Sequence, residues 1–517
     1  KLLAALLAVA MVCAMAIPAF AYNPGETKED LNTKHDYGAF QIFEGVISKD
    51  NETLSDVNWG SNIDPDNFLP QLKSADTIGP LFANANSAQD VLEVISQWHD
   101  SDDNSIAFAR VVCHYLYPDA NANPTPVATD HTGGINIPKS GYYLIVDTST
   151  FSDDDFYHAY NSFFLLNVPQ TPYVVLVNHK VVKPTVEKEV YDNNDIGSTG
   201  GWGSSADHAI NEPFQFRLIA KLPASENNGR AYDYYKKYTV CFNDTLSDGI
   251  TFDKLDTVEI TNGDGSTPQV INNYTLDPND PQSSFKLSID DVKTCVPDLN
   301  KGATITVTYT AHLNDKATVN TANGSKTTDN KNSVYLEYSN NPRIDTSLDH
   351  TITSEVCVYT YQLNNTKYRD EVNENNKLPG AGFRLYSNEA CHDEDEIKLK
   401  MNDDGTYSRD FSTEGKGVEM ISGQDGQFNV KGLDAGTYYL KETTPPSGYS
   451  ACANKEIVIS ATHNGNHVEL DSSKLSTTII NKKDGGITLP STGGIGTTIF
   501  YVVGGGLMVA AIVLLVT

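Results

Sequence analysis

The sequence predicts a mainly β protein made of tandem, immunoglobulin-like β-sandwich modules, the first of which carries added helices. Short apolar runs alternate with clusters of Asn, Asp, Thr and Ser, which is typical of strands separated by polar turns. Tyrosine occurs 27 times among the 517 residues and favours strands. Between an apolar segment at each end lie about 470 residues, enough for three modules at the usual ~150 residues each.

The charge limits the class of partner. The formal net charge is −30 at pH 7. A surface this acidic repels nucleic acid and anionic lipid, so we expect neither as a partner. It suits a soluble extracellular protein whose copies repel one another.

The two apolar ends predict export and anchoring. Leu2–Ala16 is nearly unbroken apolar sequence, and Ala19–Ala21 is a small-x-small cleavage site, so residues 1–21 are expected to form a signal peptide and the mature protein to begin at Tyr22. The glycine-rich run Ile495–Val516 is long enough to cross a bilayer as one transmembrane helix. We therefore expect a secreted protein held at the cell surface by its C-terminus.

The first module, residues 22–175, is expected to mix helices with strands. A capping box at Ser87 and Asp90 predicts the start of one helix, and Ser105 is expected to cap a second. Two strands are predicted, Ala39–Ile47 and Gly141–Val146.

The second module, 184–345, and the third, 352–483, are predicted to be β-sandwiches, and no helical pattern appears in the second. The predicted strands are Phe214–Leu222, Tyr238–Phe242, Thr304–Thr310 and Val334–Tyr338 in the second module, and Val356–Leu363, Gly382–Tyr386, Gly426–Val430, Gly436–Lys441 and Lys455–Ser460 in the third.

Export permits disulfides among the six cysteines of the mature chain, which are Cys113, Cys241, Cys295, Cys357, Cys391 and Cys452. Within modules, Cys241 could pair with Cys295 and Cys391 with Cys452, although other connectivities stay open. The sequence shows no zinc-ligand spacing, and the acidic runs 100–103 and 152–155 lack that of a calcium loop. We expect no metal and no cofactor.

The six residues Leu489–Gly494 read Leu-Pro-Ser-Thr-Gly-Gly and directly precede the C-terminal apolar run. They resemble the LPXTG sorting signal of Gram-positive surface proteins. The resemblance implies that a sortase recognises Leu489 and Pro490, cuts between Thr492 and Gly493, and passes the Thr492 acyl group to an amine. The alternative is a chance match beside an ordinary anchor. The chain has no initial Met and no basic tail, so both ends are expected to be clipped.

The third module carries a second specific resemblance. Gly436–Tyr449 reads Gly-Thr-Tyr-Tyr-Leu-Lys-Glu-Thr-Thr-Pro-Pro-Ser-Gly-Tyr and resembles the E-box of the B-type domain of collagen adhesins, which also builds pilins. In that family a Lys on the first strand and an Asn on the last fuse into an isopeptide bond beside an acid. The resemblance implies Lys367 and Asn481 as the crosslinked pair and Glu442 as the acid. The alternative makes Lys367 and Glu442 solvated surface charges.

Physical chemistry explains why the crosslink needs these residue types. A lysine amine attacks only when neutral, and burial in an apolar core lowers the pKa of a lysine. Burial also favours the protonated carboxyl group, so Glu442 is expected to donate a hydrogen bond to the Asn481 amide oxygen and make its carbon electrophilic. Lys367 then attacks, ammonia leaves, and the step happens once per molecule.

The second module repeats this logic. Pro184–Val190 and Asn332–Pro342 resemble the first and last strands of the A-type pilin domain. The resemblance implies a crosslink between Lys188 and Asn332. Its acid is expected to be Asp244, with Glu212 as the second choice. Asp244 also fits an ordinary turn aspartate, and that alternative stays open.

The joint between the first two modules carries a candidate for polymerisation. His35–Phe43 and Pro138–Asp147 resemble parts of the N-terminal domain of sortase-assembled major pilins. In such pilins an exposed Lys at this joint attacks the sorting threonine of the next subunit. Lys180 lies at the matching distance before Pro184, and Lys183 is the competitor.

These resemblances imply the backbone subunit of a covalently polymerised, cell-wall-anchored pilus that supports adhesion. The expected partners are a pilus-assembly sortase, identical subunits, accessory pilins, peptidoglycan and a host ligand. The alternative is a monomeric wall-anchored adhesin that binds a host or matrix ligand through the first module. We do not expect an enzyme, because the sequence holds no nucleophile elbow, no His-Glu-x-x-His and no phosphate loop.

Overall fold

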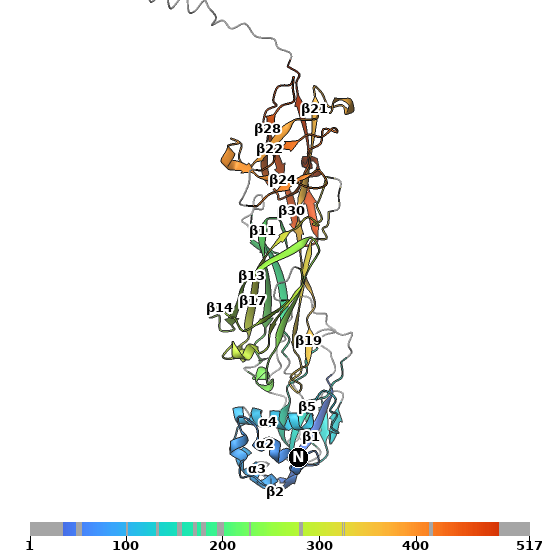
Figure 1. Ribbon diagram of the computed structural model, residues 1–517. Coiled ribbons are helices and arrows are strands. Elements are labelled where there is room, and N and C mark those ends of the chain that lie inside the picture. Colours follow the sequence, from blue (N-terminus) through green and yellow to red (C-terminus); the bar gives the residue numbers. More distant parts are fainter. Residues whose placement is uncertain are drawn as a thin grey trace, which may run out of the picture.

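The computed structural model of the chain describes residues 35–47, 54–99, 102–130, 134–151, 158–168, 173–176, 182–193, 201–226, 229–278, 283–322, 324, 326–412 and 417–484. These residues form three mainly β modules that follow one another along an elongated body (Figure 1). None of their helices is long and apolar enough to cross a membrane. The predicted signal peptide, 1–21, and the sorting signal with its apolar run, 489–517, lie outside the described residues.

The N-terminal module is built around one sheet of strand order β2-β1-β5-β6, with β3 beside β1, and a second sheet of β4 and β7. Side chains of β1 alternate between two cores, so Phe40 and Ile42 pack against the helices while Tyr37 and Ala39 pack against β4 and β7. The strands are β1 (Tyr37–Ile47), β2 (Leu54–Trp59), β3 (Ala128–Asp130), β4 (Gly134–Ile137), β5 (Gly141–Asp147), β6 (Phe164–Val168) and β7 (Tyr173–Leu176).

The helices of this module partly match the prediction. They are α2 (Pro65–Lys73), η2 (Gly79–Phe82), α3 (Ala88–Ile95) and α4 (Asp103–Leu116). Helix α3 begins after Ser87 with the predicted capping box. The predicted cap at Ser105 is wrong: α4 begins after Asp102, and the Ser105 hydroxyl instead donates to the carbonyl of His99 over 2.8 Å. Helix α2 was not predicted.

The middle module is a sandwich of two sheets. One has the order β10-β20-β18-β12-β16-β15, with β19 beside β18, and the other has the order β14-β13-β17-β11-β8-β9. The strands are β8 (Thr185–Asp192), β9 (Gly201–Gly203), β10 (Ser205–Asp207), β11 (Pro213–Leu222), β12 (Val240–Leu246), β13 (Ile250–Asn262), β14 (Gln269–Val270), β15 (Thr275–Asp277), β16 (Phe285–Ile289), β17 (Ala303–Leu313), β18 (Lys331–Ser339), β19 (Leu348–His350) and β20 (Ser354–Tyr359).

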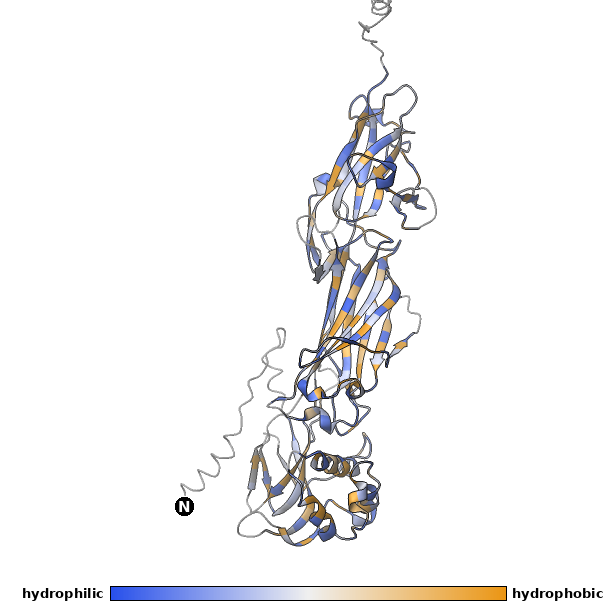
Figure 2. Cartoon of the chain, turned by 90° about the vertical axis from the view of Figure 1, so that its left-hand side faces the viewer, coloured by the Kyte–Doolittle hydropathy of each residue, from blue (hydrophilic) through white to orange (hydrophobic). Residues whose placement is uncertain are grey.

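Alternation along these strands separates core from solvent. Hydrophobic and hydrophilic residues alternate along the long strands of the middle module (Figure 2), and every second residue of β11 and β17 is buried. The described part of this module has no α-helix, only short turns such as η4 (Ala231–Tyr234), η5 (Val292–Thr294) and η6 (Leu299–Lys301). The strands predicted for it all lie in or overlap observed ones.

The C-terminal module is a smaller sandwich. Its sheets have the orders β24-β25-β27-β21-β32 and β23-β22-β28-β29, with β26 beside β22, and β30 pairs with β31. The strands are β21 (Tyr361–Arg369), β22 (Gly382–Tyr386), β23 (Glu396–Ile397), β24 (Leu399–Met401), β25 (Tyr407–Arg409), β26 (Met420–Ile421), β27 (Val430–Leu433), β28 (Gly436–Thr444), β29 (Lys455–Ile459), β30 (Ala461–Asn464), β31 (His467–Leu470) and β32 (Ser476–Asn481); η7 (Glu374–Asn376), η8 (Asp393–Asp395) and η9 (Ser472–Leu475) are short turns.

Two expected strands of this module differ from the structure. The predicted strand Val356–Leu363 is divided between β20, which completes a sheet of the middle module, and β21, which opens the C-terminal module. The predicted strand Gly426–Val430 begins only at Val430, because Gly426 has a φ of +73° and belongs to a turn. Strands β19 and β20 also follow β18, so the strand of Asn332 is not the last of the middle module.

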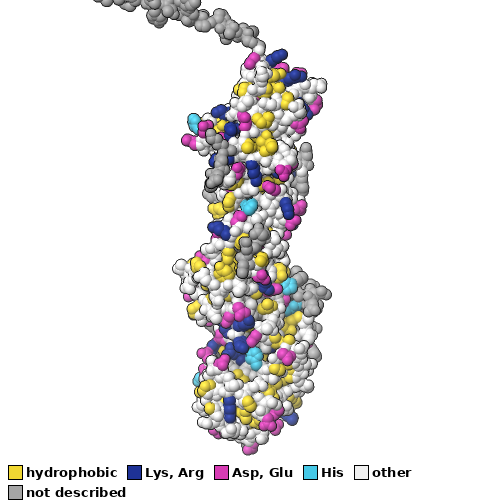
Figure 3. Space-filling model, viewed as in Figure 1, with side chains coloured by type: hydrophobic (Ala, Val, Ile, Leu, Met, Phe, Trp, Pro, Cys, Tyr) yellow, Lys and Arg dark blue, Asp and Glu magenta, His cyan; other side chains and the backbone are white. Residues whose placement is uncertain are grey.

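Both junctions between modules are packed. Between the first two, the Arg343 guanidinium lies over the rings of Tyr117 and Tyr160, at 4.8 and 4.6 Å from their centroids. Between the last two, the Ile210 amide donates to the Gly432 carbonyl over 3.0 Å. On the face shown in Figure 3, acidic and basic side chains are interspersed along the whole body, as a solvated surface requires.

Replacing Gly432 with alanine should weaken the second junction. Gly432 has a φ of +72°, and an added Cβ would lie 2.5 Å from the Cδ1 atom of Ile210. We expect the free energy of unfolding to fall by about 2–4 kcal/mol, the sum of backbone strain and overpacking. Gly405→Ala is the control, because Gly405 has a φ of +81° and open space around it. Equal losses for both variants in thermal unfolding would contradict the packed junction.

Candidate functional site

A buried lysine, glutamate and asparagine meet in the C-terminal module. Lys367 lies on β21 and Asn481 on the neighbouring parallel strand β32, where Asn481 pairs with Arg369. Glu442 lies on β28 of the opposite sheet. Because Lys367 follows the alternation of β21, its side chain enters the core, and the exposed fractions are 0% for Lys367, 1% for Asn481 and 6% for Glu442. The three residues that the resemblance nominated therefore do come together.

The contacts among these three side chains are direct. The Lys367 ammonium donates to the carbonyl oxygen of Asn481. One carboxylate oxygen of Glu442, Oε1, lies 3.2 Å from Lys367 Nζ and accepts from Asn481 Nδ2 over 2.7 Å. The ring of Phe383 closes the site, with its centroid 5.1 Å from Nζ. Burial of Lys367 lowers the pKa of its amine, despite opposing effects of Cys452 and Glu442.

The orientation of the asparagine differs from the expectation. Glu442 was expected to donate to the amide oxygen, whereas the structure has Glu442 accept from the amide nitrogen. The same carboxylate oxygen thus faces both the attacking amine and the nitrogen that would leave. This geometry suits a carboxylate that carries a proton from the nucleophile to the leaving group.

The middle module holds a second cluster of the same residue types. Lys188 lies on β8 of one sheet, and Asp244 and Asn332 lie on β12 and β18 of the other. In the register of β12 and β18, Asp244 is opposite Val334. Asn332 is two residues from Val334 along β18, so its side chain points to the same face of the sheet as that of Asp244. All three side chains are buried, with exposed fractions of 2% for Lys188, 1% for Asp244 and 0% for Asn332. A bond from Lys188 to Asn332 would join the two sheets.

A tyrosine that the sequence analysis missed connects this cluster. Tyr309 of β17 accepts from Lys188 Nζ over 3.1 Å and from Asn332 Nδ2 over 2.5 Å, and its hydroxyl donates to Asp244 Oδ1 over 3.0 Å. Lys188 also forms an ion pair with Asp244. The carbonyl oxygen of Asn332 is buried without a hydrogen-bond partner among the described residues, which is costly in a dry core. The alternation of β17 marked Tyr309 only as a core residue.

Burial perturbs the charges of this cluster. It lowers the pKa of the Lys188 amine to about 8, although Asp244 opposes the change. It also raises the pKa of the Asp244 carboxyl, against the effects of Lys188 and Tyr309. Both shifts favour the neutral amine and the neutral acid that amide formation needs.

An Asn332→Ala variant should reveal the buried Lys188 amine through the pH dependence of its free energy of unfolding. Its free Lys188 has a pKa of about 8 when folded and the ordinary value of 10.5 when unfolded, so the unfolded chain binds more protons between these values. The free energy of unfolding should therefore rise from pH 8 to 10.5, by about 3 kcal/mol over the window. A crosslinked parent has no titrating amine there. Denaturant unfolding at several pH values compares the two, and parallel profiles would contradict the prediction.

Of the remaining nominated residues, the two that the structure describes, Glu212 and Lys183, do not join these clusters. Glu212, the second choice for the acid, lies near the C-terminal module, where Oε2 accepts from the Ala209 amide over 3.0 Å and lies 3.9 Å from Arg409. Lys183 is half-buried just before β8, whereas Lys180 lies outside the described residues. The sorting residues Leu489, Pro490, Thr492 and Gly493 also lie outside them.

The expected disulfides are not formed: all six described cysteines are free thiols. In β12, Cys241 stands between the core residues Val240 and Phe242 and so points to the opposite face of the sheet. Cys295 instead packs against the core of the sandwich. The two sulfur atoms of the expected pair are therefore directed to different sides.

The other expected pair is also separate. The sulfur of Cys391 accepts a hydrogen bond from Asn454 Nδ2 over 3.4 Å. Cys452 lies beside the Lys367 cluster, where its backbone amide donates to Glu442 Oε2 over 2.8 Å and burial raises the pKa of its thiol to about 11. Cys452 thus helps to position the acid, a role that the sequence pattern did not reveal.

Asp147 ends β5, whose sequence Gly-Tyr-Tyr-Leu-Ile-Val-Asp is similar to the Gly-Thr-Tyr-Tyr-Leu-Lys-Glu segment that ends at Glu442. It is 1% exposed and accepts from His35 Nδ1 over 2.6 Å, from the Ser149 hydroxyl over 2.6 Å and from the Asn161 amide over 2.8 Å. Burial works to raise the pKa of Asp147, but the hydrogen bonds and the imidazole of His35 outweigh it and lower the pKa. This carboxylate is held in its charged form and suits a structural role.

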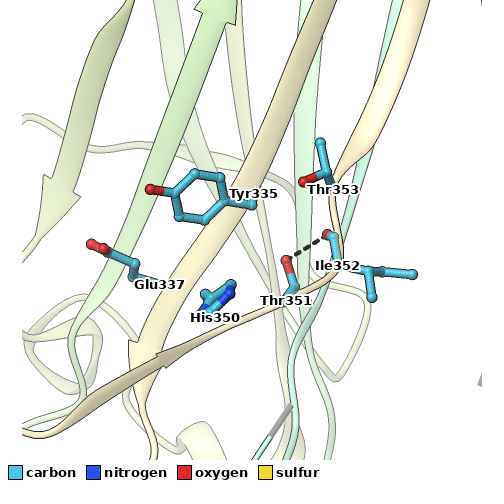
Figure 4. Close-up of a pocket in the computed structure, with 6 residues that line it drawn as sticks. All are labelled: Tyr335, Glu337, His350, Thr351, Ile352 and Thr353. Atoms are coloured by element: carbon cyan, nitrogen blue, oxygen red, sulfur yellow. Dashed lines mark hydrogen bonds between the residues drawn. The ribbon is translucent and has the colours of Figure 1, made fainter. Parts of the chain in front are cut away.

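An open pocket lies on the outer face of the middle module, over β18 and β19 (Figure 4). Its lining residues are Tyr335, Glu337, His350, Thr351, Ile352 and Thr353. Glu337 is engaged by Lys286. Because Tyr335 and Glu337 alternate with the buried Val334 and Leu336, the pocket lies on the opposite face of β18 from the Lys188 cluster.

Comparison with known proteins adds one domain assignment. Residues 361–474 match the SpaA family, described as a prealbumin-like fold domain. This segment holds Lys367 and Glu442 and ends before Asn481. No curated protein sequence matches the chain.

Solved structures of major pilins resemble the chain at low identity. The T6 backbone pilin of Streptococcus pyogenes is 15% identical, with 87% of this chain and 96% of that chain covered and a TM-score of 0.44. The major pilin SpaD of Corynebacterium diphtheriae is 16% identical, with 87% and 93% covered and a TM-score of 0.41. A C-terminal fragment of the major pilin GBS80 of Streptococcus agalactiae is 21% identical, with 58% and 99% covered and a TM-score of 0.40.

Proposed function

We propose that the chain is the backbone subunit of a sortase-assembled, cell-wall-anchored surface pilus, stiffened by two intramolecular isopeptide bonds. The observation that carries the proposal is the pair of buried clusters in successive modules, each with a lysine, an acid and an asparagine. In the C-terminal module the three side chains touch directly, and in the middle module the Tyr309 hydroxyl links Asn332 to Lys188 and Asp244. Chance burial of one lysine in an apolar core is already rare. The SpaA match over 361–474 and the sequence resemblances support the same assignment.

The proposed reaction balances without any co-reactant. In the C-terminal module, neutral Lys367 attacks the Cγ carbon of Asn481, so the Nζ–Cγ bond forms and the Cγ–Nδ2 bond breaks. Glu442 takes one proton from Nζ and gives one to Nδ2, which leaves as ammonia. In the middle module Asp244 takes a proton from Lys188 Nζ, and the Tyr309 hydroxyl, which contacts both Asp244 and Asn332 Nδ2, passes one to the nitrogen that leaves as ammonia.

A crosslink in each module suits a fibre under tension. Strands β21 and β32 are parallel neighbours near the two ends of the C-terminal module, so a bond between them gives force a covalent path that bypasses the rest of the module. Lys367 and Asn481 are 114 positions apart. By analogy with disulfides, closing such a loop removes about 4–5 kcal/mol of unfolded-state entropy, and it also slows unfolding by force or protease.

Intact-mass spectrometry of a protein spanning residues 22–483, under reducing conditions, tests this function first. The expected mass is short of the sequence mass by two ammonia molecules, and peptide mapping should place one bond between Lys188 and Asn332 and the other between Lys367 and Asn481. A measured mass equal to the sequence mass would refute the crosslinking chemistry in both modules. The monomeric adhesin would then become the better hypothesis.

A further inference from the structure

A separate cluster of buried titratable groups lies where the middle and C-terminal modules meet. His208 and Glu212 come from the middle module, just before β11, and Asp434 comes from the turn between β27 and β28. Ligand atoms of the three side chains all lie within 4.8 Å of one another. His208 is 0% exposed and Asp434 is 2% exposed. The sequence analysis singled out only Glu212, and for another role.

His208 presents a bare nitrogen to this cluster. Its Nε2 atom lies 2.8 Å from the carbonyl oxygen of Tyr191. Because a carbonyl oxygen only accepts, Nε2 carries the proton. Nδ1 has no hydrogen-bond partner among the described residues, so it is not donating a proton to either carboxylate. A metal-bound histidine is held in just this way, with its other nitrogen donating to a backbone carbonyl.

The junction also carries excess negative charge. Four carboxyl groups converge there, those of Asp192, Asp207, Glu212 and Asp434, and the hydrogen bond between Asp207 and Asp434 needs a proton on one of them, which leaves three to carry charge. Arg409 contributes one positive charge, 3.9 Å from Glu212. Buried carboxylates are stable when they are paired or bind a metal. A divalent cation would offset much of the excess negative charge.

A neighbouring cluster of Asp192, Asp207 and His463 has the same ligand types, but its histidine is already engaged. His463 Nε2 contacts Asp192 over 3.1 Å, and Nδ1 contacts the Ser205 hydroxyl over 2.9 Å. Neither ring nitrogen of His463 is open to a metal without breaking one of these contacts. The open nitrogen of His208 distinguishes the two clusters.

We propose that His208 Nδ1, Glu212 and Asp434 bind a Zn²⁺ ion that ties the middle module to the C-terminal module. One imidazole and two carboxylates are suitable Zn²⁺ ligands, whereas Ca²⁺ and Mg²⁺ prefer oxygen alone. The amides of Ala209 and Asn193 orient the Glu212 carboxylate, at 3.0 and 3.5 Å. The site goes beyond the proposed crosslinks and would stiffen the joint between two crosslinked modules.

The test uses the untagged mature protein, stripped with chelator and dialysed against Zn²⁺. Plasma mass spectrometry should find one zinc per chain. At zinc concentrations about 100-fold above Kd, the melting temperature of the two joined modules should rise by about 5–10 °C relative to chelator. His208→Gln and Asp434→Asn should each lose the zinc and the shift. His463→Gln and His312→Gln, the latter at a partly exposed histidine on β17 that is outside both clusters, should keep the zinc and the shift.

Three outcomes would overturn the site. The first is that the parent protein binds no stoichiometric zinc. The second is that both His208→Gln and Asp434→Asn still bind zinc. The third is that His463→Gln loses the zinc while those two variants keep it.

If His208→Gln fails to fold, Co²⁺ bound to the parent protein gives a second readout. Its visible absorption should be strong, as in a low-coordinate site with a nitrogen ligand, and Asp434→Asn should abolish it. The crosslinks report separately through intact mass, so loss of zinc leaves the proposed function untouched.

Discussion

Replacing Glu442 with glutamine is expected to leave Lys367 and Asn481 unjoined and to restore one ammonia to the mass of the protein. Glu442 Oε1 faces both reacting nitrogens, at 3.2 Å from Lys367 Nζ and 2.7 Å from Asn481 Nδ2. Glutamine has the same shape but cannot take up a proton from the amine and return it to the leaving group. The bond in the middle module should form as before.

The loss of this bond should be visible in stability as well as mass. The variant loses the loop constraint of about 4–5 kcal/mol and keeps a lysine buried without its carboxylate. For a module of this size, we expect its melting temperature to fall by about 10–20 °C. Differential scanning calorimetry of the full mature protein should show the C-terminal transition moving while the middle transition stays.

Glu419→Gln is the matched control for this experiment. Glu419 lies in the same module and accepts hydrogen bonds from Thr443 and Thr444, but it is only half-buried and forms no described contact with Lys367. Its variant should crosslink fully. A Glu442→Gln protein with the parent mass would refute the proton-carrying role of Glu442.

Replacing Lys180 with alanine should abolish polymerisation by the pilus sortase. The reaction needs an amine that reaches the acyl-enzyme formed at Thr492 of another subunit. Lys183 is a poorer candidate because it is half-buried and lies between the buried Val182 and Pro184, two residues before the first strand of the middle module. Lys180 lies farther from that strand in the chain.

The experiment is expression with a pilus-assembly sortase in a Gram-positive host, followed by denaturing electrophoresis of wall extracts. The parent and Lys183→Ala should give a ladder of covalent multimers, while Lys180→Ala should give monomer alone. Lys180→Arg keeps the positive charge, but a guanidinium group stays protonated at working pH and cannot act as the nucleophile. This variant should also give monomer. A ladder in Lys180→Ala that disappears in Lys183→Ala would reassign the nucleophile to Lys183.

The C-terminal site could be predicted from sequence because the E-box resembles that of a domain family with a lysine, an acid and an asparagine at matching positions. The resemblance nominated Glu442, Lys367 and Asn481. Strand alternation then sends all three side chains into one core. Cys452 escaped notice because its contribution is a backbone amide, which any residue could supply.

In the middle module the pattern left more open. It nominated Lys188 and Asn332 but could not choose between Asp244 and Glu212. The choice depends on which of the two side chains points into the core after folding. Tyr309 looked like any core residue of an alternating strand until the opposite sheet brought three polar groups to its hydroxyl. The predicted disulfide pairs were wrong for the same reason, because the direction in which each thiol points depends on how the sheets pack.

The sequence by itself determined the β-rich modular architecture and the order of the modules, because period-two alternation and turn signals act within a few residues. It nominated the lysine–acid–asparagine set of the C-terminal module through the resemblance of its E-box to a known domain family. Only the tertiary structure decided the acid partner of Lys188, the free state of the thiols, and the assembly of His208 and Glu212 with Asp434 across a module boundary. Those groups lie far apart in the chain, so their meeting depends on how sheets and modules pack rather than on any local pattern.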